Sequence, residues 1–210
     1  MSSLQAGRHD VLLISLLLLL STPAEQKGFE DIAEGKARPG HFRGVATIVT
    51  KLFNIVQPTN AYFGQKDAAQ CALIQRAVED LDMPLTVHIV PTVREADGLA
   101  MSSRNAYLTP LERRAAPIVY QSLCAARDLF SSVISKTTGD EELIMVPASH
   151  LRDAVQSTLA SEPLVSVVQY IAIDDKRTMR PIEHVTVREG AIVSLAVKVG
   201  SVRLIDNIVL

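Results

Sequence analysis

The sequence predicts an α/β protein: a parallel sheet with helices up to about Pro91, followed by a smaller part made of helices and antiparallel strands. Residues 61–90 contain an apolar strand, a helix and a second apolar strand, the pattern of two parallel strands joined by a right-handed crossover. From Val165 onward the chain has β-rich runs, with Gly190 and Gly200 placed for the tight connections of antiparallel strands.

The composition is that of a folded globular protein, and it excludes several function classes. The chain has 210 residues, of which 48% are apolar, and a formal net charge of −2 with both signs spread along it. Neither a nucleic-acid surface nor a polybasic membrane patch is expected, so any attraction to anions must be local. Cys71 and Cys124 lie in apolar helical patterns without a second thiol or a His at metal-ligand spacing. Both are predicted to be buried thiols, and no metal site is predicted.

Residues 1–27 form a leader that differs from the rest of the chain. Val11–Leu20 is a nearly continuous apolar run, followed by small residues up to Ala24, as in a signal peptide. About twenty apolar residues are needed to cross a bilayer, so no stable membrane span is expected from this run. A secretory route stays open if residues 11–24 act as a signal peptide. A cytoplasmic location is favoured, because the start is weakly basic and Asp10 abuts the run.

The first part of the chain is expected to alternate loop, helix and strand. Residues 35–44 are rich in Gly and Pro and predict a loop. Apolar residues from Val45 to Val56 recur at the spacing of one helical face, and Pro58 ends that helix. The remaining elements are a strand, a helix and a strand, expected over residues 61–63, 67–82 and 85–90.

The second part is expected to begin with a loop over residues 94–105 and then a helix. Thr109, Pro110 and Glu112 form a helix start with an N-cap, a proline at the first position and a capping box. This helix is expected to reach about Ser132. A polar linker, a helix and a small antiparallel sheet then follow, over residues 135–142, 147–160, 165–173, 182–187, 192–199 and 202–209.

A candidate phosphate site lies where the first strand meets its helix. Gly64 lets the backbone approach a ligand, the helix start offers unpaired N–H groups, and Lys66 adds a mobile positive charge. Open α/β sheets bind ligands at this end of their strands. Asp67 and Gln70 share a helix face and could hold one polar substrate. The spacing leaves open that Asp67 only caps the helix and that Lys66 is solvated.

A second candidate lies in Met101–Arg104, which offers two hydroxyls and a guanidinium suited to bidentate phosphate contact. By itself it could equally be a Ser-rich surface turn. Because the loops after adjacent parallel strands lie side by side, the two candidates together predict one polyphosphate site. Arg38 and His41 are compatible with a further anion contact, although ordinary loop residues are the favoured interpretation. His88 is interpreted as a core or sheet-face histidine.

Four segments of the chain, in order, resemble the pantothenate synthetase (pantoate–beta-alanine ligase) family. They are residues 38–45 (RPGHFRGV), residues 63–67 (FGQKD) with Gln70, residues 90–105 (VPTVREADGLAMSSRN) and residues 203–207 (RLIDN). The resemblance extends from about Gly28 to the C-terminus. It implies a Rossmann-like sheet of the nucleotidyltransferase superfamily, with an ATP- and pantoate-binding domain over residues 28–92. It also implies a C-terminal α+β domain over residues 93–210, which contains the phosphate-binding loop 94–105.

The resemblance also implies an activity. Pantoate would be activated by ATP and Mg²⁺ to pantoyl adenylate with release of pyrophosphate, and beta-alanine would then attack to give pantothenate and AMP. It further implies a cytoplasmic homodimer. By position, the implied ATP-binding residues are Gly64, Gln65, Lys66, Asp67, Val93, Met101, Ser102, Ser103 and Arg104. Of these, Lys66, Ser102, Ser103 and Arg104 would act catalytically by offsetting charge on the leaving pyrophosphate, while Gln70 and Arg38 would bind pantoate.

The chain departs from the family pattern in two ways. The family usually has Glu at the position of Gln65. The family's His-x-Gly-His segment and its first strands find no counterpart, and the leucine-rich leader is expected to match nothing in the family. We therefore expect an N-terminally incomplete version with impaired activity. The alternatives are a non-catalytic remnant that binds nucleotide or pairs with a full-length synthetase, and a secreted or membrane-tethered protein that reuses the fold.

Overall fold

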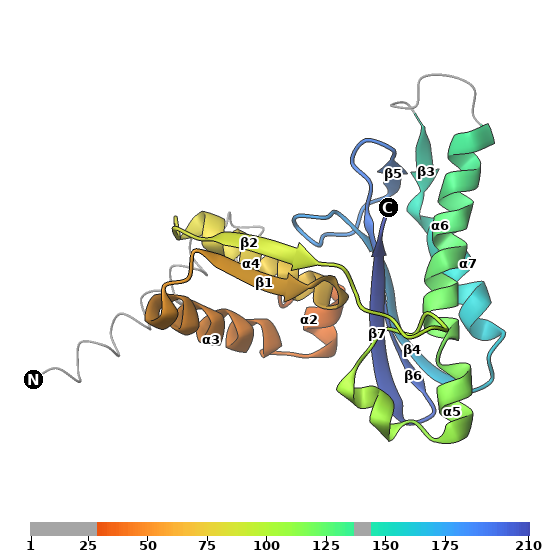
Figure 1. The fold of residues 1–210 in the computed structure, drawn as a ribbon. Coiled ribbons are helices and arrows are strands. Elements are labelled where there is room, and N and C mark those ends of the chain that lie inside the picture. Colours follow the sequence, from red (N-terminus) through yellow and green to blue (C-terminus); the bar gives the residue numbers. More distant parts are fainter. Residues whose placement is uncertain (1–28, 137–143) are drawn as a thin grey trace, which may run out of the picture. The chain divides into compact units, whose positions relative to one another are not determined.

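The computed structural model describes residues 29–136 and 144–210, so the leader and most of the predicted polar linker lie outside the described residues. The described part divides into two compact units (Figure 1). The first contains residues 29–63 and 69–90, and the second contains residues 64–68 together with everything described from Pro91 onward. The second unit is the larger in this chain, although its sequence predicts a smaller part. The linear boundary expected after residue 92 stays a prediction.

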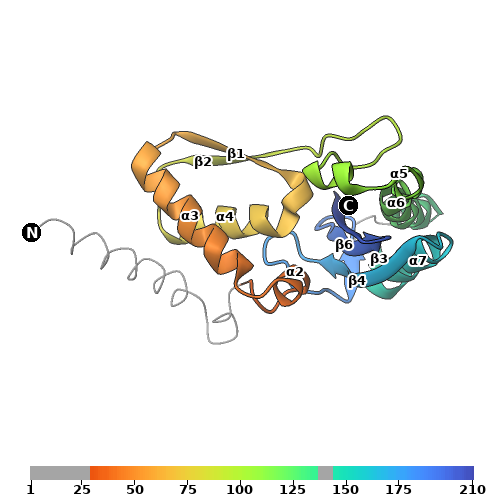
Figure 2. The ribbon, with the colours of Figure 1, turned by 90° about the horizontal axis from the view of Figure 1, so that it is seen from below.

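The first unit is a two-stranded parallel sheet with helices on one side (Figure 2). Its elements are α2 (Ala33–Ala37), α3 (His41–Val56), β1 (Asn60–Gly64), α4 (Ala68–Asp80) and β2 (Thr86–Val90). The strands run in the same direction, because Thr86 N, at the start of β2, donates to Thr59 O, just before the start of β1, at 2.9 Å. The predicted strand, helix and strand are confirmed.

The loop predicted over residues 35–44 is wrong. Helix α2 occupies its first part, and α3 already begins at His41. Gly35 is needed for close packing rather than for a turn, since a Cβ there would lie 2.0 Å from the carbonyl oxygen of Phe29. Gly40 takes the left-handed conformation with φ of 76° and donates its N–H to Glu30 Oε2 at 2.8 Å, which fixes the start of α3.

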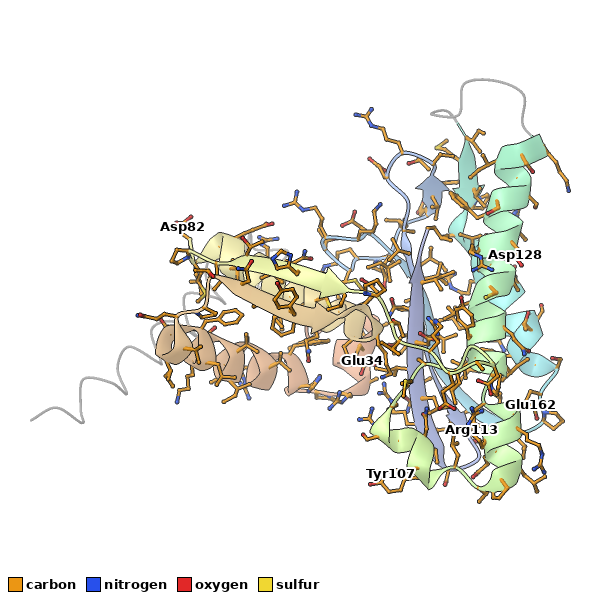
Figure 3. The ribbon with its side chains drawn as sticks, in the orientation of Figure 1. Glu34, Asp82, Tyr107, Arg113, Asp128 and Glu162 are labelled. Atoms are coloured by element: carbon orange, nitrogen blue, oxygen red, sulfur yellow. The ribbon has the colours of Figure 1, made fainter. Side chains whose placement is uncertain are left out.

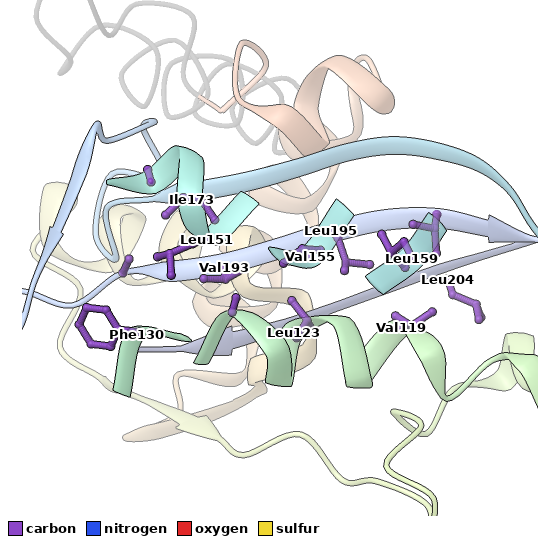
Figure 4. Packing of buried hydrophobic residues seen from close by; sticks show 14 of the residues in the cluster. Val119, Leu123, Phe130, Leu151, Val155, Leu159, Ile173, Val193, Leu195 and Leu204 are labelled. Carbon is purple, nitrogen blue, oxygen red and sulfur yellow. The ribbon is translucent and has the colours of Figure 1, made fainter. Parts of the chain in front are cut away.

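The second unit packs two long helices on one face of a three-stranded antiparallel sheet (Figure 4). Its elements are η1 (Gln65–Asp67), η2 (Ser103–Tyr107), α5 (Pro110–Ala115), α6 (Ile118–Lys136), β3 (Met145–Pro147), α7 (Ala148–Ala160), β4 (Val165–Asp174), β5 (His184–Thr186), β6 (Ile192–Val199) and β7 (Val202–Val209). The sheet order is β4-β6-β7, and its core includes Leu123, Leu151 and Leu195, all fully buried. The predicted antiparallel sheet is confirmed.

Three details of this unit differ from the sequence expectations. The helix after Thr109 is not continuous, because Pro117 lacks an N–H and separates α5 from α6. Its capping box is confirmed, with Thr109 N donating to Glu112 Oε2 at 2.7 Å. Strand β5 pairs with β3, a strand that the sequence did not predict, instead of joining the larger sheet. Cys71 is buried as expected, but Cys124 is only half-buried.

None of the helices within residues 29–136 and 144–210 combines the length and the apolar character that crossing a bilayer requires. The described ranges likewise contain no group of three or more His, Cys, Asp or Glu side chains arranged to hold a metal ion.

Candidate functional site

Both loops singled out by the sequence line one pocket in the second unit. The polar residues of this pocket come from η1, from η2 and the residue just before it, and from β7. They are Lys66, Ser102, Arg104, Asn105, Arg203 and Asp206. Leu99, Val119 and Leu204 are among the apolar residues that complete the wall. Lys66, Ser102 and Arg104 therefore border the same small space, with a cavity volume of about 10 Å³.

The turn that carries Lys66 follows directly from the end of β1. Gly64 has extended backbone, with φ of −79°, and a Cβ there would meet nothing within 4 Å, so the space beside it is open. Residues 65–67 form a single 3₁₀ turn, and α4 begins at Ala68 rather than at Asp67. Lys66 is half-buried, whereas Asp67 is exposed. The lysine therefore reaches the pocket from a short turn and not from a regular helix.

The loop that carries Ser102 and Arg104 is held by its own backbone. Met101 N donates to Val93 O at 2.9 Å, and Arg94 and Ala100 form an isolated antiparallel bridge. Ser102 Oγ accepts the N–H of Arg104 at 3.2 Å, which caps the start of η2. The segment is thus a closed, hydrogen-bonded loop rather than a loose Ser-rich turn.

Ion pairs with α5 brace the base of this loop. The side chain of Arg113, which can be followed in Figure 3, donates to Glu95 Oε2 at 2.5 Å and to Asp97 Oδ2 at 2.6 Å. The hydrogen bond from Arg113 holds the pKa of Asp97 below its usual value, although burial acts in the opposite direction. Asn105 adds hydrogen bonds to Glu95 Oε1 and to Ala100 O, each at 3.1 Å. The loop is therefore fixed at both ends before any ligand binds.

The pocket has a positive balance of charge. Lys66, Arg104 and Arg203 contribute cations, and Asp206 contributes the carboxylate. Burial raises the pKa of Asp206, while the hydrogen bond and charge of Arg94 and the charge of Lys66 act in the opposite direction. Asp206 forms an ion pair with Arg94 at 2.6 Å, and Arg94 is not one of the residues that line the pocket. The negative charge of Asp206 is therefore offset by a group outside the pocket. Arg203 also donates through Nε to Gln169 Oε1 of β4 at 2.7 Å. Arginine and lysine side chains are suited to an anion with several negative oxygens.

The other residues predicted for the site do not all line this pocket. Ser103, Val93 and Met101 are exposed, the last two at 67% and 56%. Arg38 and Gln70 belong to the first unit. There Arg38 Nη1 lies 2.9 Å from His41 Nε2 and 3.7 Å from Glu34 Oε1.

The sequence predicted no role for several residues that lie at the pocket. Arg203 and Asp206 line it directly, and Asn207 contacts the turn that carries Lys66. One signal could have identified them. Asp206 and Asn207 are adjacent polar residues inside an otherwise apolar strand pattern, and both prove to be buried, with 2% and 3% exposure. Buried polar pairs of this kind need partners, and such partners cluster at functional sites.

The chain matches the family model described as Pantoate-beta-alanine ligase over residues 14–209. The pantothenate synthetase of Herpetosiphon aurantiacus is 49% identical over 190 residues, which cover 90% of this chain and 64% of that protein. The pantothenate synthetase of Heliobacterium modesticaldum is 49% identical over 175 residues, covering 83% of this chain and 57% of that protein. The match begins inside the apolar run Val11–Leu20, so the expectation that the leader matches nothing in the family is wrong.

Solved structures give the same result. Pantothenate synthetase from Thermus thermophilus superposes with a TM-score of 0.73 at 40% identity, covering 83% of this chain and 58% of that chain. Pantoate-beta-alanine ligase from Francisella tularensis, solved in complex with beta-gamma ATP and beta-alanine, gives a TM-score of 0.55 at 31% identity. It is covered over 53% of its length. This chain thus spans less than two thirds of each of these relatives, and by sequence and fold it belongs to the pantoate-beta-alanine ligase family.

Proposed function

We propose that this chain acts in the ATP-dependent condensation of pantoate with beta-alanine to pantothenate, through a pantoyl-adenylate intermediate. The observation that carries the proposal is the meeting of Lys66, Ser102 and Arg104 in one positively charged pocket. These residues come from two loops whose sequences match the family motifs in order. The family of ligases to which the chain belongs supplies the reaction, and the pocket supplies groups suited to its phosphate chemistry.

In the first step a pantoate carboxylate oxygen attacks the α-phosphorus of ATP, and the bond from that phosphorus to the bridging oxygen of the β-phosphate breaks. Negative charge then grows on the departing pyrophosphate. Lys66 and Arg104 stabilise that charge, and the hydroxyls of Ser102 and Ser103 donate hydrogen bonds to phosphate oxygens. In the second step the beta-alanine amine attacks the activated carbonyl and AMP leaves, which requires mainly that the two reactants be held together.

The remaining contacts are proposed on the same basis. Gln70 and Arg38 hold pantoate. The nucleotide is bound by the other residues of the two loops, namely Gly64, Gln65, Asp67, Val93 and Met101. Mg²⁺ is proposed to bind together with the triphosphate of ATP, since this ion commonly keeps phosphate oxygens and waters among its ligands. When bound, it offsets phosphate charge during release of pyrophosphate.

The test measures the first step directly. The full chain is mixed with ATP, Mg²⁺ and pantoate, and pyrophosphate release is followed, with AMP formation measured after addition of beta-alanine. Lys66→Ala and Arg104→Ala should each lower the rate about 10²–10³-fold, the cost of losing one preorganised charge or donor. Lys136→Ala, which removes a surface charge at the end of α6, should leave the rate unchanged. No turnover by the unmodified chain, or equal rates for all variants, would contradict the proposal.

A second candidate function is nucleotide binding without turnover, alone or in association with a full-length synthetase. It is favoured by one observation: the described pocket brings together Lys66, Ser102 and Arg104, whose groups are suited to phosphate contacts. It predicts saturable binding of ATP by the full chain, weakened by Lys66→Ala, with no pyrophosphate release. Co-purification with a complete synthetase would support the paired form.

The family resemblance also leads us to propose a cytoplasmic homodimer. Light scattering on the full chain distinguishes one copy from two, and a mass of a single chain at micromolar concentration would contradict the dimer. Fractionation of cells that express the chain with Met1 intact tests the location, and recovery in the secreted fraction would contradict it.

A further inference from the structure

We propose that Asn207 is a positioning residue for Lys66, and that Asp206 and Arg94 hold Asn207 in the required place. The inference deepens the proposed function and rests on it, because it concerns the residue that would contact the phosphates. The family motifs by themselves assign no role to Asn207, Asp206 or Arg94. Hydrogen bonds within the second unit connect these three residues to the turn of Lys66.

The side-chain amide of Asn207 binds the turn that carries Lys66 through all its polar atoms. Its nitrogen, Nδ2, donates to the carbonyl oxygens of Gln65 and Lys66, each at 2.9 Å. Its oxygen, Oδ1, accepts from Gln65 Nε2 at 2.9 Å. Gln65 and Asn207 are more than a hundred positions apart in the chain, so these hydrogen bonds are long-range contacts that connect the turn to β7.

The orientation of this amide is determined by its partners. Two carbonyl oxygens can only accept hydrogen bonds, so the side of Asn207 that faces them must be the donating nitrogen. The oxygen of Asn207 then faces a group that must donate, and the amide of Gln65 does so. Asn207 therefore binds two successive carbonyl oxygens of a single 3₁₀ turn. These hydrogen bonds restrict the backbone position of Lys66, from which its side chain extends.

Asn207 is itself fixed by an ion pair between the half-buried Arg94 and the buried Asp206. Arg94 donates to Asp206 through Nη1 at 2.6 Å and through Nη2 at 3.0 Å. Asp206 Oδ1 accepts the backbone N–H of Asn207 at 2.8 Å. The Arg94 guanidinium also lies over the Tyr120 ring, 3.8 Å from its centroid. A bidentate ion pair whose guanidinium also stacks on an aromatic ring is held in one orientation. This orientation fixes the backbone of β7 at Asp206 and Asn207.

The same arginine belongs to the other phosphate loop. Arg94 pairs with Ala100 in a backbone bridge, immediately before Met101–Arg104, and its Nη1 donates to Gly98 O at 3.1 Å. One guanidinium thus joins the loop of Ser102 and Arg104 to the strand that grips the Lys66 turn. The three residues Arg94, Asp206 and Asn207 set the spacing between the two phosphate-binding groups.

Stability alone does not account for these residues. Replacing a buried ion pair by apolar residues of similar volume is often neutral or stabilising, and β7 already packs apolar side chains into the core. The hydrogen bonds that run from Arg94 through Asp206 and Asn207 end on the carbonyl oxygens of Gln65 and Lys66. We explain these polar residues by their effect on the position of Lys66. Loss of Asn207 should therefore loosen the turn while leaving the sheet β4-β6-β7 intact.

The decisive variant is Asn207→Asp in the full chain. It replaces the donating nitrogen by a carboxylate oxygen that faces two carbonyl oxygens. At pH 7.5, hydrogen exchange in a peptide covering residues 63–69 should lose about 10- to 100-fold of its protection, the effect of losing two hydrogen bonds of ordinary strength. The Kd for ATP with Mg²⁺ should rise by a similar factor. Protection in β6 should not change.

Lowering the pH should reverse the effect of Asn207→Asp. The folded-state pKa of the introduced carboxyl should be raised above the unfolded value, because the ionised form faces carbonyl oxygens while the protonated form can donate one hydrogen bond. Protection of residues 63–69 should therefore return as the pH falls through the folded pKa and be lost as the pH rises. Asn60→Asp, the same substitution at an exposed position of β1, should show neither the loss nor the recovery.

Further outcomes keep the proposal testable. Should Asn207→Asp fail to fold, Gln65→Ala removes only the third hydrogen bond and should loosen the same peptide to a smaller degree. Unchanged exchange at residues 63–69 would overturn the proposal, and so would a loss of protection spread evenly over β6 and β7. Failure of the unmodified chain to bind ATP would count against the proposed function alone, since the exchange measurement needs no nucleotide.

Discussion

The two sheets of this chain differ in how completely they are buried. In the second unit β6 is the middle strand, and nearly all its residues are buried. The face toward the core that contains α6 and α7 carries Val193, Leu195, Val197 and Val199. In the first unit β2 alternates between half-buried and exposed residues, and Tyr62 of β1 is 67% exposed. A parallel sheet is usually covered on both faces, whereas an antiparallel one needs only one. The sheet type therefore does not tell which unit holds the main core.

Helix α3 shows the same contrast within its own sequence. Its apolar stripe has the spacing of a buried helix face, yet Ile48 is 54% and Leu52 is 49% exposed. In α6 the comparable positions Val119, Leu123 and Ala126 are at most 1% exposed. Periodicity thus identifies the face of a helix that can be buried, and tertiary partners decide whether it is. The stability of the described chain should accordingly reside mainly in the second unit.

The largest expected effect tests that contrast with one substitution made in both units. Leu195→Ala empties space at a fully buried position of β6 and should lower the free energy of unfolding by about 2–5 kcal/mol. Leu52→Ala, at a half-exposed position of α3, should cost about 1 kcal/mol or less. Urea unfolding of both variants measures the difference. Equal losses would show that the first unit contributes as much core as the second.

The next effect concerns a buried carboxyl at the end of β4. Burial raises the pKa of Asp174 to about 7, although the charge of Arg152 acts the other way. The folded state then binds a proton that the unfolded state has lost, so stability should fall as the pH rises from about 4 to about 7 and level off above that. Asp174→Asn should remove this dependence and stabilise the protein at pH 8 by on the order of 2–4 kcal/mol.

The control for this change is Asp153→Asn, at an exposed position on α7 of the same unit. It should leave the pH dependence of unfolding unaltered. Denaturant titrations at pH 4.5 and pH 8 give the comparison, since the benefit of Asp174→Asn should be small at the lower pH and full at the higher. A benefit of the same size at both values would rule out titration of Asp174 as the cause.

Local signals in the sequence predicted much of the fold. The strand, helix and strand of the first unit and the capping box at Thr109 depend on neighbours within a few residues, and they are present. The pairing of β5 with β3 depends on residues about forty positions apart, which no local pattern specifies. Gly35 contributed to the wrong prediction of a loop over residues 35–44, because a glycine required by close packing looks the same in sequence as one required by a turn.

The candidate site was predictable in part for the same reason. Lys66, Ser102 and Arg104, which line one pocket, could be singled out because each lies in a loop after a strand. Arg94, Asp206 and Asn207 could not be singled out, since their hydrogen bonds form only once β7 lies beside both loops. Residues that touch a ligand tend to sit in recognisable loops, whereas residues that hold those loops can lie anywhere in the chain.

A smaller effect is expected at Gly98, in the loop of the second unit. This glycine has φ of +90°, and a Cβ would lie 2.5 Å from the Tyr120 ring. Gly98→Ala should therefore cost about 1–3 kcal/mol of stability, through backbone strain and displacement of the ring. Because Tyr120 stacks on Arg94, the variant should also loosen residues 63–69 in hydrogen exchange. Stability loss without that loosening would separate Tyr120 from the positioning of Lys66.

The smallest expected effect is at the N-cap of α5. Thr109 Oγ1 accepts the N–H of Glu112 at 3.3 Å, and the Glu112 carboxylate also accepts the N–H of Ser201, in the turn between β6 and β7, at 3.3 Å. Thr109→Ala should cost about 1 kcal/mol in urea unfolding, and Thr109→Ser, which keeps the hydroxyl, should cost less. Because α5 also carries Arg113, which braces the Ser102 loop, a loss well above that value would mean that the cap supports the loop as well as the helix. Equal losses for the two variants would instead assign the effect to the methyl group of Thr109.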